Sequence, residues 1–411
     1  MEKAHLLPSA AGDLTCASNS TGSAGESRFI FSKDPNLSLR FLRLKTGSLG
    51  HVPEEPGILR IRLLWARNGI YWALKALGIG PEDEVLAPAY ICRAALDPVE
   101  HLGSRVILYK VTGECRADLV DLRARISPRV KAVIAVHYFG FPERIREIRE
   151  ICNAFGLVLI EDCAHVLTGM TDGGRLGSFG DASVFSWRKV LPVYDGADLI
   201  IRAPVVNPLP PMVRQPLYLE LRTVFNLISR AATQERSSVF LRKCMQLAGW
   251  VASRRPRLKS ENAIHPEMSA VDFSSSLLGL PMSTVSTQLL QHSDLARIAL
   301  QRRNNYCYLA RCLAGIPRVR LLYPELPERI CPWILPLVFE GMTGAHLTLR
   351  RRGIPAVTWG EVRPRQLRDG DFPEAQHLYD NLVFLPIHQD LTLSDMERIS
   401  REAGKITALN A

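Results

Sequence analysis

The sequence predicts an α/β fold in which a mostly parallel β-sheet lies between layers of helices. From about residue 58 onward, short apolar runs alternate with stretches whose apolar residues recur at helical spacing. Strands that alternate with helices in this way form a parallel sheet covered on both faces. The chain has 411 residues, of which 47% are hydrophobic, so it is long enough for two domains that each bury a core.

The predicted elements of the first half follow one another in a regular order. Residues 68–77 have the pattern of a helix. Between residues 142 and 155, apolar residues recur at helical spacing with Arg and Glu on the other side, and Gly156 ends this helix at the expected place. Apolar runs predict strands at 84–88, 105–109 and 131–136.

The second half has the pattern of a smaller α/β unit. A long helical pattern at 294–313 carries Arg302 and Arg303 and is followed by a strand-like run at 332–339. A closing run at 385–388 precedes a helix that begins near Ser394. We expect these elements to form a separate small domain.

Two chemically reactive side chains fall at the ends of predicted strands. Asp162 ends an apolar run that begins at Leu157, and Lys189 closely follows a second run that ends at Ser186. Both would lie at the carboxyl ends of parallel strands, where open α/β sheets bind ligands. Taken singly, Asp162 would cap a helix and Lys189 would be a solvated loop residue. Together they indicate a pyridoxal phosphate site, because that cofactor needs an amine for its aldehyde and an anion for its ring nitrogen.

The residues around this pair resemble the DegT/DnrJ/StrS family of pyridoxal phosphate-dependent aminotransferases, which make amino sugars on nucleotide carriers. Residues 161–165, EDCAH, resemble the acid motif, in which Asp162 would pair with the pyridine nitrogen and His165 would lie beside the ring. The run GSFGDA at 177–182 and the FSW motif that contains Ser186 resemble the approach to the family lysine. Lys189 comes two residues earlier than the commonest spacing, but the following Leu-Pro-Val is similar to a branch with this shorter spacing.

The resemblance also implies where the cofactor phosphate and ring would bind. The family's Ser/Asn-Gly-Thr phosphate motif matches Asn68, Gly69 and Ile70, which open the first predicted helix, and helix N-termini attract anions. Ser186 is the expected side-chain donor to the phosphate. An aromatic residue that stacks on the ring in the family is replaced by Cys92, so either Cys92 or an aromatic such as Tyr90 would cover the ring.

Three other residues are candidates for the substrate side of the site. His137 lies in a segment similar to the family's Val-His-Leu-Tyr-Gly, and we interpret it mainly as a strand-end packing residue, with a catalytic role as the alternative. Trp359 and His388 lie on segments that approach the substrate in the family, although both residues fit a core position equally well. A Gly-x-Asn-x-Arg motif, by which a dimer partner contacts the phosphate, is missing before Met282.

The resemblance implies aminotransferase fold type I and a transamination reaction. The expected reaction moves an amino group from glutamate to a keto-sugar carried on a nucleotide diphosphate, within a homodimer. A dehydrating branch has His in place of the lysine, so Lys189 favours transamination. The alternatives are a catalytically altered protein with a regulatory or scaffold role, and an aminotransferase for a non-sugar ketone or aldehyde. The implied divisions are a flexible tail at 1–40, a large domain at 41–285 with an insertion at about 203–265, and a small domain at 286–411.

Most of the excess positive charge lies in one segment. Residues 201–260 contain eleven Lys and Arg against two Glu, while the whole chain has a net charge of +10. Leu217, Leu221, Val224, Phe225 and Ile228 recur at helical spacing, and residues 239–251 predict a second amphipathic helix. We interpret these helices as a cover for the active site or the dimer interface. Peripheral contact with an anionic membrane is the alternative, and the lack of interleaved aromatics argues against nucleic acid binding.

The cysteines and the apolar runs indicate a cytoplasmic location. The nine cysteines are scattered, odd in number and never spaced as Cys-x-x-Cys, so neither a disulfide framework nor a metal site is expected. No run of about 18 apolar residues predicts a membrane-spanning helix, and the first residues lack the pattern of a signal peptide.

Overall fold

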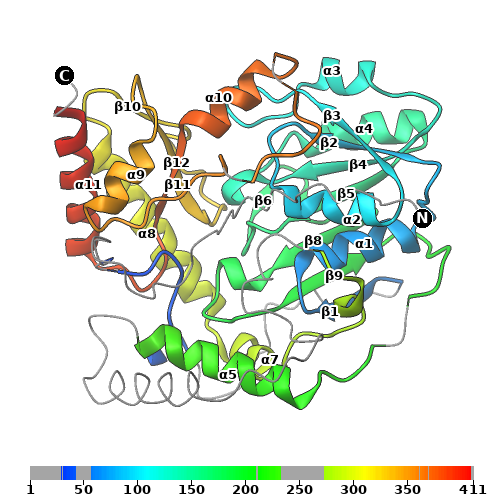
Figure 1. Ribbon diagram of the computed structural model, residues 1–411, viewed down its shortest axis with the longest axis horizontal. Coiled ribbons are helices and arrows are strands. Elements are labelled where there is room, and N and C mark those ends of the chain that lie inside the picture. The colour runs from blue at the N-terminus through cyan, green and yellow to red at the C-terminus, as the bar shows by residue number, and fades with distance from the viewer. Residues whose placement is uncertain are drawn as a thin grey trace, which may run out of the picture.

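The protein is built on a seven-stranded sheet, around which we name the large domain, and a three-stranded sheet nearer the C-terminus, around which we name the small domain (Figure 1). The computed structural model describes residues 29, 31–42, 57–209, 212–232, 273–360, 362–368 and 370–408. The strands of the large sheet, in spatial order, are β1 (Leu59–Leu63), β9 (Ala197–Ile201), β8 (Ala182–Ser186), β5 (Val158–Cys163), β4 (Val130–Val136), β2 (Glu84–Pro88) and β3 (Arg105–Tyr109).

The large sheet is mostly parallel, as predicted. The neighbouring strands β8, β5, β4, β2 and β3 all run in the same direction, and only β9 runs antiparallel to its neighbours β1 and β8. Every residue of β2 and β9 is buried, which explains why these strands, apart from Glu84 and Asp198, are apolar instead of alternating. The predicted α/β class is confirmed.

Helices cover the two faces of this sheet. Ile134 and Val136 of β4 pack in the same core cluster as α1 (Ala66–Ala76), while Val133 and Ala135 pack with α4 (Ile145–Phe155). Because successive residues of a strand point to opposite faces, α1 and α4 lie on opposite sides of the sheet. The figure shows α4 with α3 (Leu119–Ala124) on one side and α1 with α2 (Asp97–His101) on the other (Figure 1).

The helix α4 ends where the sequence predicts. Gly156 follows it with a φ of 66°, a left-handed conformation that glycine adopts without steric cost. Ile145, Ile148 and Ile151 are buried beneath the helix, whereas Phe155 is 47% exposed. The predicted apolar face is therefore correct except at its last residue, which reaches past the edge of the core.

The small domain is an antiparallel sheet packed against helices. Its strands are β10 (Val319–Leu321), β11 (Ile334–Phe339) and β12 (Leu382–Pro386). The long helix α8 runs from the centre of the molecule to the small domain, where it packs against α11 (Figure 1). The helices of this half are α8 (Leu295–Leu313), α9 (Ala345–Arg351), α10 (Pro373–Asn381) and α11 (Leu393–Ala408).

Part of the basic segment forms a helix, as predicted. The helix α5 (Leu217–Ala232) packs against α7 (Thr284–His292), and α7 leads into the small domain. The second predicted helix at 239–251 lies outside the described residues. No helix within the described ranges is both long and apolar enough to cross a membrane.

Residues 31–42 overlap the end of the predicted tail and pack against the rest of the chain. Phe31 and Phe41 are 8% and 5% exposed, and a backbone bridge joins Leu42 to Ser293. The first 28 residues lie outside the described part, so the prediction of a flexible tail concerns mainly residues that the structure leaves undescribed. A short hairpin, β6 (Met170–Thr171) and β7 (Gly174–Arg175), completes the described strands.

Candidate active site

Lys189 and Asp162 lie at the carboxyl ends of two neighbouring parallel strands of the large sheet, β8 and β5. Asp162 is the penultimate residue of β5, and Lys189 ends a 3₁₀ turn that begins directly after β8. Asp162 is only 8% exposed, and its Oδ1 accepts the N–H of Ala164 at 2.9 Å. The short turn thus brings the lysine back over the end of the strand that carries the acid.

The two side chains act on each other electrostatically. Burial raises the pKa of Asp162, and the positive charge of Lys189 opposes that shift. Burial also lowers the pKa of Lys189, and the negative charge of Asp162 opposes it in turn. An acid and an amine that share one partly buried space are the arrangement that the sequence predicts for this edge.

Cys92 belongs to the same group of side chains. It follows β2, two strands away from β5 in the sheet, and is half-buried. Burial raises the pKa of its thiol, Lys189 and Arg67 lower it, and Asp162 raises it. Arg67 lies in the first turn of α1, 8% exposed, with its guanidinium 4.3 Å from the ring centroid of Trp65. Sequence reasoning passed over Arg67 because the motif drew attention to the next three residues.

The residues of the predicted phosphate motif at 68–70 make packing contacts. The Asn68 side chain donates to the Leu277 carbonyl at 2.8 Å, and the backbone N–H groups of Asn68 and Gly69 donate to Trp65 at 3.1 and 3.4 Å. A Cβ on Gly69 would lie 2.9 Å from a methyl group of Val184, so this glycine allows α1 to approach β8. Ile70 is 2% exposed in the main core. The helix begins at Ala66 instead of Asn68, so its first two residues precede the motif.

His165 presents an unpaired donor close to Lys189. Its Nδ1 accepts the N–H of Phe139 at 3.2 Å, so the proton of the neutral ring lies on Nε2. Burial, followed by the positive charge of Lys189, lowers the pKa of His165 well below its ordinary value, which keeps the ring neutral. The buried Nε2 has no hydrogen-bond partner among the residues that the structure describes. A ligand acceptor beside Lys189 would satisfy it.

Trp333 completes the wall next to this donor. Its ring stacks on His165, with 4.3 Å between the ring centroids and an angle of 11°, and the Lys189 Nζ lies 5.1 Å from the Trp333 ring centroid. The Trp333 N–H donates to the Phe139 carbonyl at 2.7 Å, which joins the small domain to the end of β4. The sequence held no signal for this role, because Trp333 reads as the beginning of an ordinary apolar strand.

The aromatic residues predicted for the substrate side have different environments. Tyr90 is completely buried and lies 4.7 Å from the ring of Tyr379 and 5.1 Å from that of Trp359, so it is part of the core behind the site. Trp359 lies 5.4 Å from the His165 ring and is 8% exposed. Of these two, Trp359 lies next to the candidate site.

Ser186, at the end of β8, is half-buried two residues before Arg188 and three before Lys189.

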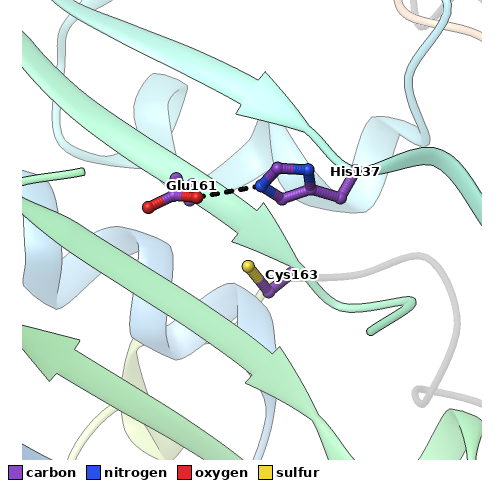
Figure 2. A group of neighbouring side chains, drawn as sticks. All are labelled: His137, Glu161 and Cys163. Atoms are coloured by element: carbon purple, nitrogen blue, oxygen red, sulfur yellow. Dashed lines mark hydrogen bonds and ion pairs between the residues drawn. The ribbon is translucent and has the colours of Figure 1, made fainter. Parts of the chain in front are cut away.

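His137 and Glu161 form an anchor beneath the site (Figure 2). The Nε2 of His137 donates to Glu161 at 2.9 Å, and its Nδ1 accepts the N–H of Glu143 at 3.1 Å. Glu161 also accepts backbone N–H groups from the turn before β8, at Gly177, Phe179 and Gly180, at 2.9, 2.6 and 2.5 Å.

Although Cys163 lies close to this pair, the group does not have the properties of a metal site. The potential ligand atoms of His137, Glu161 and Cys163 lie within 4.8 Å of one another (Figure 2). However, the histidine and the carboxylate already use their polar atoms in hydrogen bonds, and burial raises the pKa of the Cys163 thiol well above its usual range. The arrangement fixes the turn that precedes β8, which supports the interpretation of His137 as a packing residue.

His388 lies apart from the other predicted residues. Its Nε2 donates to the Ser32 carbonyl at 2.9 Å, and its Nδ1 lies 3.8 Å from Asp390. Burial lowers its pKa to about 4. His388 therefore holds the N-terminal segment against the small domain, and the structure does not bring its ring to Lys189.

The fold and this edge site define the class of protein. A solved structure of the aminotransferase TlmJ from Streptoalloteichus hindustanus matches 86% of this chain and 87% of its own, with a TM-score of 0.61 and 21% identity, which establishes a type I aminotransferase fold. Residues 66–196 match the model of the DegT/DnrJ/EryC1/StrS aminotransferase family. This match agrees with the predicted resemblance and covers the part of the chain that carries Asp162 and Lys189.

Curated relatives match part of this chain. A GDP-perosamine synthase of Vibrio cholerae is 31% identical over 140 residues, which are 33% of this chain and 38% of the relative. A dTDP-3-amino-3,4,6-trideoxy-alpha-D-glucose transaminase of Micromonospora megalomicea subsp. nigra is 29% identical over 199 residues, 46% of this chain and 52% of the relative. The matched regions thus span between about a third and a half of these relatives.

Proposed function

We propose that this protein is a pyridoxal phosphate-dependent aminotransferase that moves an amino group from glutamate to a keto-sugar carried on a nucleotide diphosphate in the cytoplasm. The observation that carries the proposal is the electrostatic interaction of Lys189 with Asp162 at the ends of β8 and β5, beside the His165 Nε2, which has no hydrogen-bond partner among the described residues. The named activities of the two curated relatives, both on nucleotide sugars, support the substrate class. Glutamate as the donor rests on the family resemblance.

The residues at the edge fit the chemical groups of pyridoxal phosphate. A buried acid, Asp162, suits the protonated ring nitrogen, and the Nε2–H of His165 suits an acceptor on the ring. The hydroxyl of Ser186, the first turn of α1 and the charge of Arg67 suit the phosphate. Cys92 stands where the family has an aromatic residue, and Cys92 and Trp333 together would flank the cofactor ring. When bound, the cofactor supplies an electron sink for the carbon next to the transferred nitrogen.

The chain's own residues would supply the amine and the proton transfers. Because burial lowers the pKa of Lys189, a larger fraction of its amine is unprotonated near neutral pH than in water. A neutral amine can attack a carbonyl carbon and can accept a proton from an adjacent carbon. Asp162, held by Ala164, would keep a proton on the neighbouring ring nitrogen, and neutral His165 would donate from Nε2 without adding charge.

Replacement of Lys189 tests this function. We expect Lys189→Ala to abolish the visible absorbance that the purified chain gains with pyridoxal phosphate, and to lower turnover of nucleotide keto-sugars with glutamate by about a thousand-fold or more. Lys131→Ala, at an exposed lysine of β4, is the matched control and should keep both properties. A Lys189→Ala protein with the full absorbance band and full turnover would refute the proposal.

We also propose that the protein is a homodimer and that α5 contributes to the interface. The outward face of α5 carries Leu217, Leu221, Phe225 and Ile228, which are 72%, 60%, 46% and 43% exposed. Its inward face is fixed to the large domain, because Thr223 is buried and contacts Asp195 of the lysine loop at 3.4 Å. Contiguous exposed apolar residues on a helix commonly mark an interaction surface.

A single charge introduced on α5 tests whether its exposed face is a dimer interface or contacts a membrane, which is the other role considered for the basic segment. Leu221→Arg should shift the molar mass in sedimentation from dimer to monomer, whereas Leu300→Arg on α8, at a side chain that is also 60% exposed, should leave it unchanged. If the unaltered chain is a monomer that floats with anionic vesicles at low salt and Leu221→Arg abolishes flotation, the exposed face binds a membrane instead.

A further inference from the structure

Arg302 is a buried arginine whose hydrogen-bond partners include no carboxylate among the described residues. It lies on α8, is 1% exposed and is one of the largest fully buried side chains. Its Nε donates to Gln389 Oε1 at 3.0 Å, its Nη1 to the Trp333 carbonyl at 2.9 Å and its Nη2 to the Val190 carbonyl at 3.2 Å. The carboxylates of Asp390 and Asp34 act on Arg302 electrostatically but accept none of these hydrogen bonds. Burial of a charge whose hydrogen bonds all go to neutral acceptors is costly, so its place in the structure calls for a reason.

The carbonyl groups that Arg302 binds belong to residues at the candidate site. Val190 directly follows Lys189 in the chain, and the Trp333 ring lies 5.1 Å from the Lys189 Nζ. Gln389 also donates to the Val190 carbonyl at 3.3 Å. One guanidinium therefore connects the lysine turn of the large domain with the segment that leads into β11 of the small domain.

The planar guanidinium fixes relative positions as well as single contacts. Its donors point in set directions, so the Val190 and Trp333 carbonyls can move apart only if a hydrogen bond breaks. A lysine at the same position would offer one ammonium group without this fork. The distance between Lys189 and the Trp333 ring, and through that ring the place of His165, thus depends on Arg302.

We infer that Arg302 is a positioning residue that holds Lys189 and Trp333 in register across the two domains. The inference rests on the proposed aminotransferase function and adds to it a residue that does not itself touch the reacting atoms. Loss of the fork would let the lysine turn loosen, and displacement of a reacting group by about 1 Å can slow catalysis by about a hundred-fold.

The neighbouring arginine offers a matched control. Arg303 lies on the same helix and also donates to backbone carbonyls, those of Pro327 and Ile330, which do not adjoin Lys189 in the chain. The experiment compares Arg302→Lys and Arg302→Met with Arg303→Lys in the full-length chain. Thermal unfolding establishes which variants fold. Arg302→Lys keeps the positive charge, so its effect reports position, and it decides the outcome if Arg302→Met does not fold.

The first readout does not require turnover. Competitive acetylation of the full-length chain without added cofactor, followed by mass spectrometry of the Lys189 peptide, gives the pH dependence of the amine. We expect the apparent pKa of Lys189 to rise by about one unit in Arg302→Lys, toward its ordinary value, because a looser turn admits water. Arg303→Lys should reproduce the unaltered profile.

The second readout separates rate from binding. With pyridoxal phosphate, glutamate and a nucleotide keto-sugar, Arg302→Lys should lower kcat at least about ten-fold and change KM less than about three-fold. An unchanged labelling profile and kcat in a folded Arg302→Lys protein, or equal effects of Arg303→Lys, overturn the inference and leave the proposed function intact. If the labelling profile of Lys189 shifts in Arg302→Lys but the unaltered chain itself shows no transamination, the proposed function is overturned instead.

Discussion

The position of one proton on His165 decides what this residue can bind. Phe139 donates its N–H to Nδ1, which leaves Nε2 as the donor, and the lowered pKa excludes a charged ring near neutral pH. The ring therefore offers one hydrogen bond in one direction, next to Lys189. The Trp333 stack fixes the plane of the ring, so that direction is set before a ligand arrives.

Two substitutions at His165 distinguish the donor from the stacked ring. His165→Phe keeps a flat ring against Trp333 but removes the Nε2–H, so we expect pyridoxal phosphate to bind about ten-fold more weakly. His165→Gln keeps a side-chain N–H donor and should bind within about three-fold of the unaltered chain. Equilibrium dialysis measures both affinities. Equal affinity in His165→Phe and the unaltered chain would show that the ring, and not the donor, carries the interaction.

The strand ends position the site because hydrogen bonds fix the turns next to them. Glu161, on the strand that carries Asp162, binds three backbone N–H groups of the turn before β8 and the His137 ring. The start of β8 is thereby fixed relative to β5, and with it the turn that ends at Lys189. The acid motif thus has two roles, since one carboxylate faces the candidate site and the other builds the frame around it.

The first helix shows how an element can be recognised while its first residue is misplaced. Asn68 is a residue type common at helix N-caps, and the motif led us to place the helix start and the phosphate contact there. Trp65 is the actual cap residue, with an extended backbone, and the helix runs from Ala66. Asn68 instead binds Leu277, more than 200 residues away in sequence, a contact that no local pattern predicts.

Acid should destabilise the whole molecule through its buried histidines. The folded pKa of His388 is about 4, below its ordinary value of 6.5, and that of His165 is also lowered. Between these values the unfolded chain binds protons that the folded chain does not, so the free energy of unfolding decreases as the pH falls from about 6.5 toward 4. For His388 the loss is at most about 3 kcal/mol.

Urea denaturation at pH 7.5 and pH 5 measures this dependence. His388→Gln should be less stable than the unaltered chain at pH 7.5, because the contact with Ser32 changes, but it should lose less stability between the two pH values. His377→Gln, at an exposed histidine of α10, is the control and should follow the unaltered chain. An identical pH dependence in the His388→Gln protein would contradict the assignment.

The sequence by itself determined the α/β class, the bounds of β2 and β3 and the motif around Asp162 and Lys189, because these depend on local signals. The run at β2 is largely apolar because all of its residues are buried, and the residues around Asp162 and Lys189 form a contiguous motif. Tertiary structure decided the rest. Trp333, Arg67 and Arg302 gain their proposed roles from residues distant in sequence, and no local pattern indicates the contacts of His388 with Ser32 or of Tyr90 with Tyr379. Side-chain direction and burial are set by packing between elements, which a linear pattern does not encode.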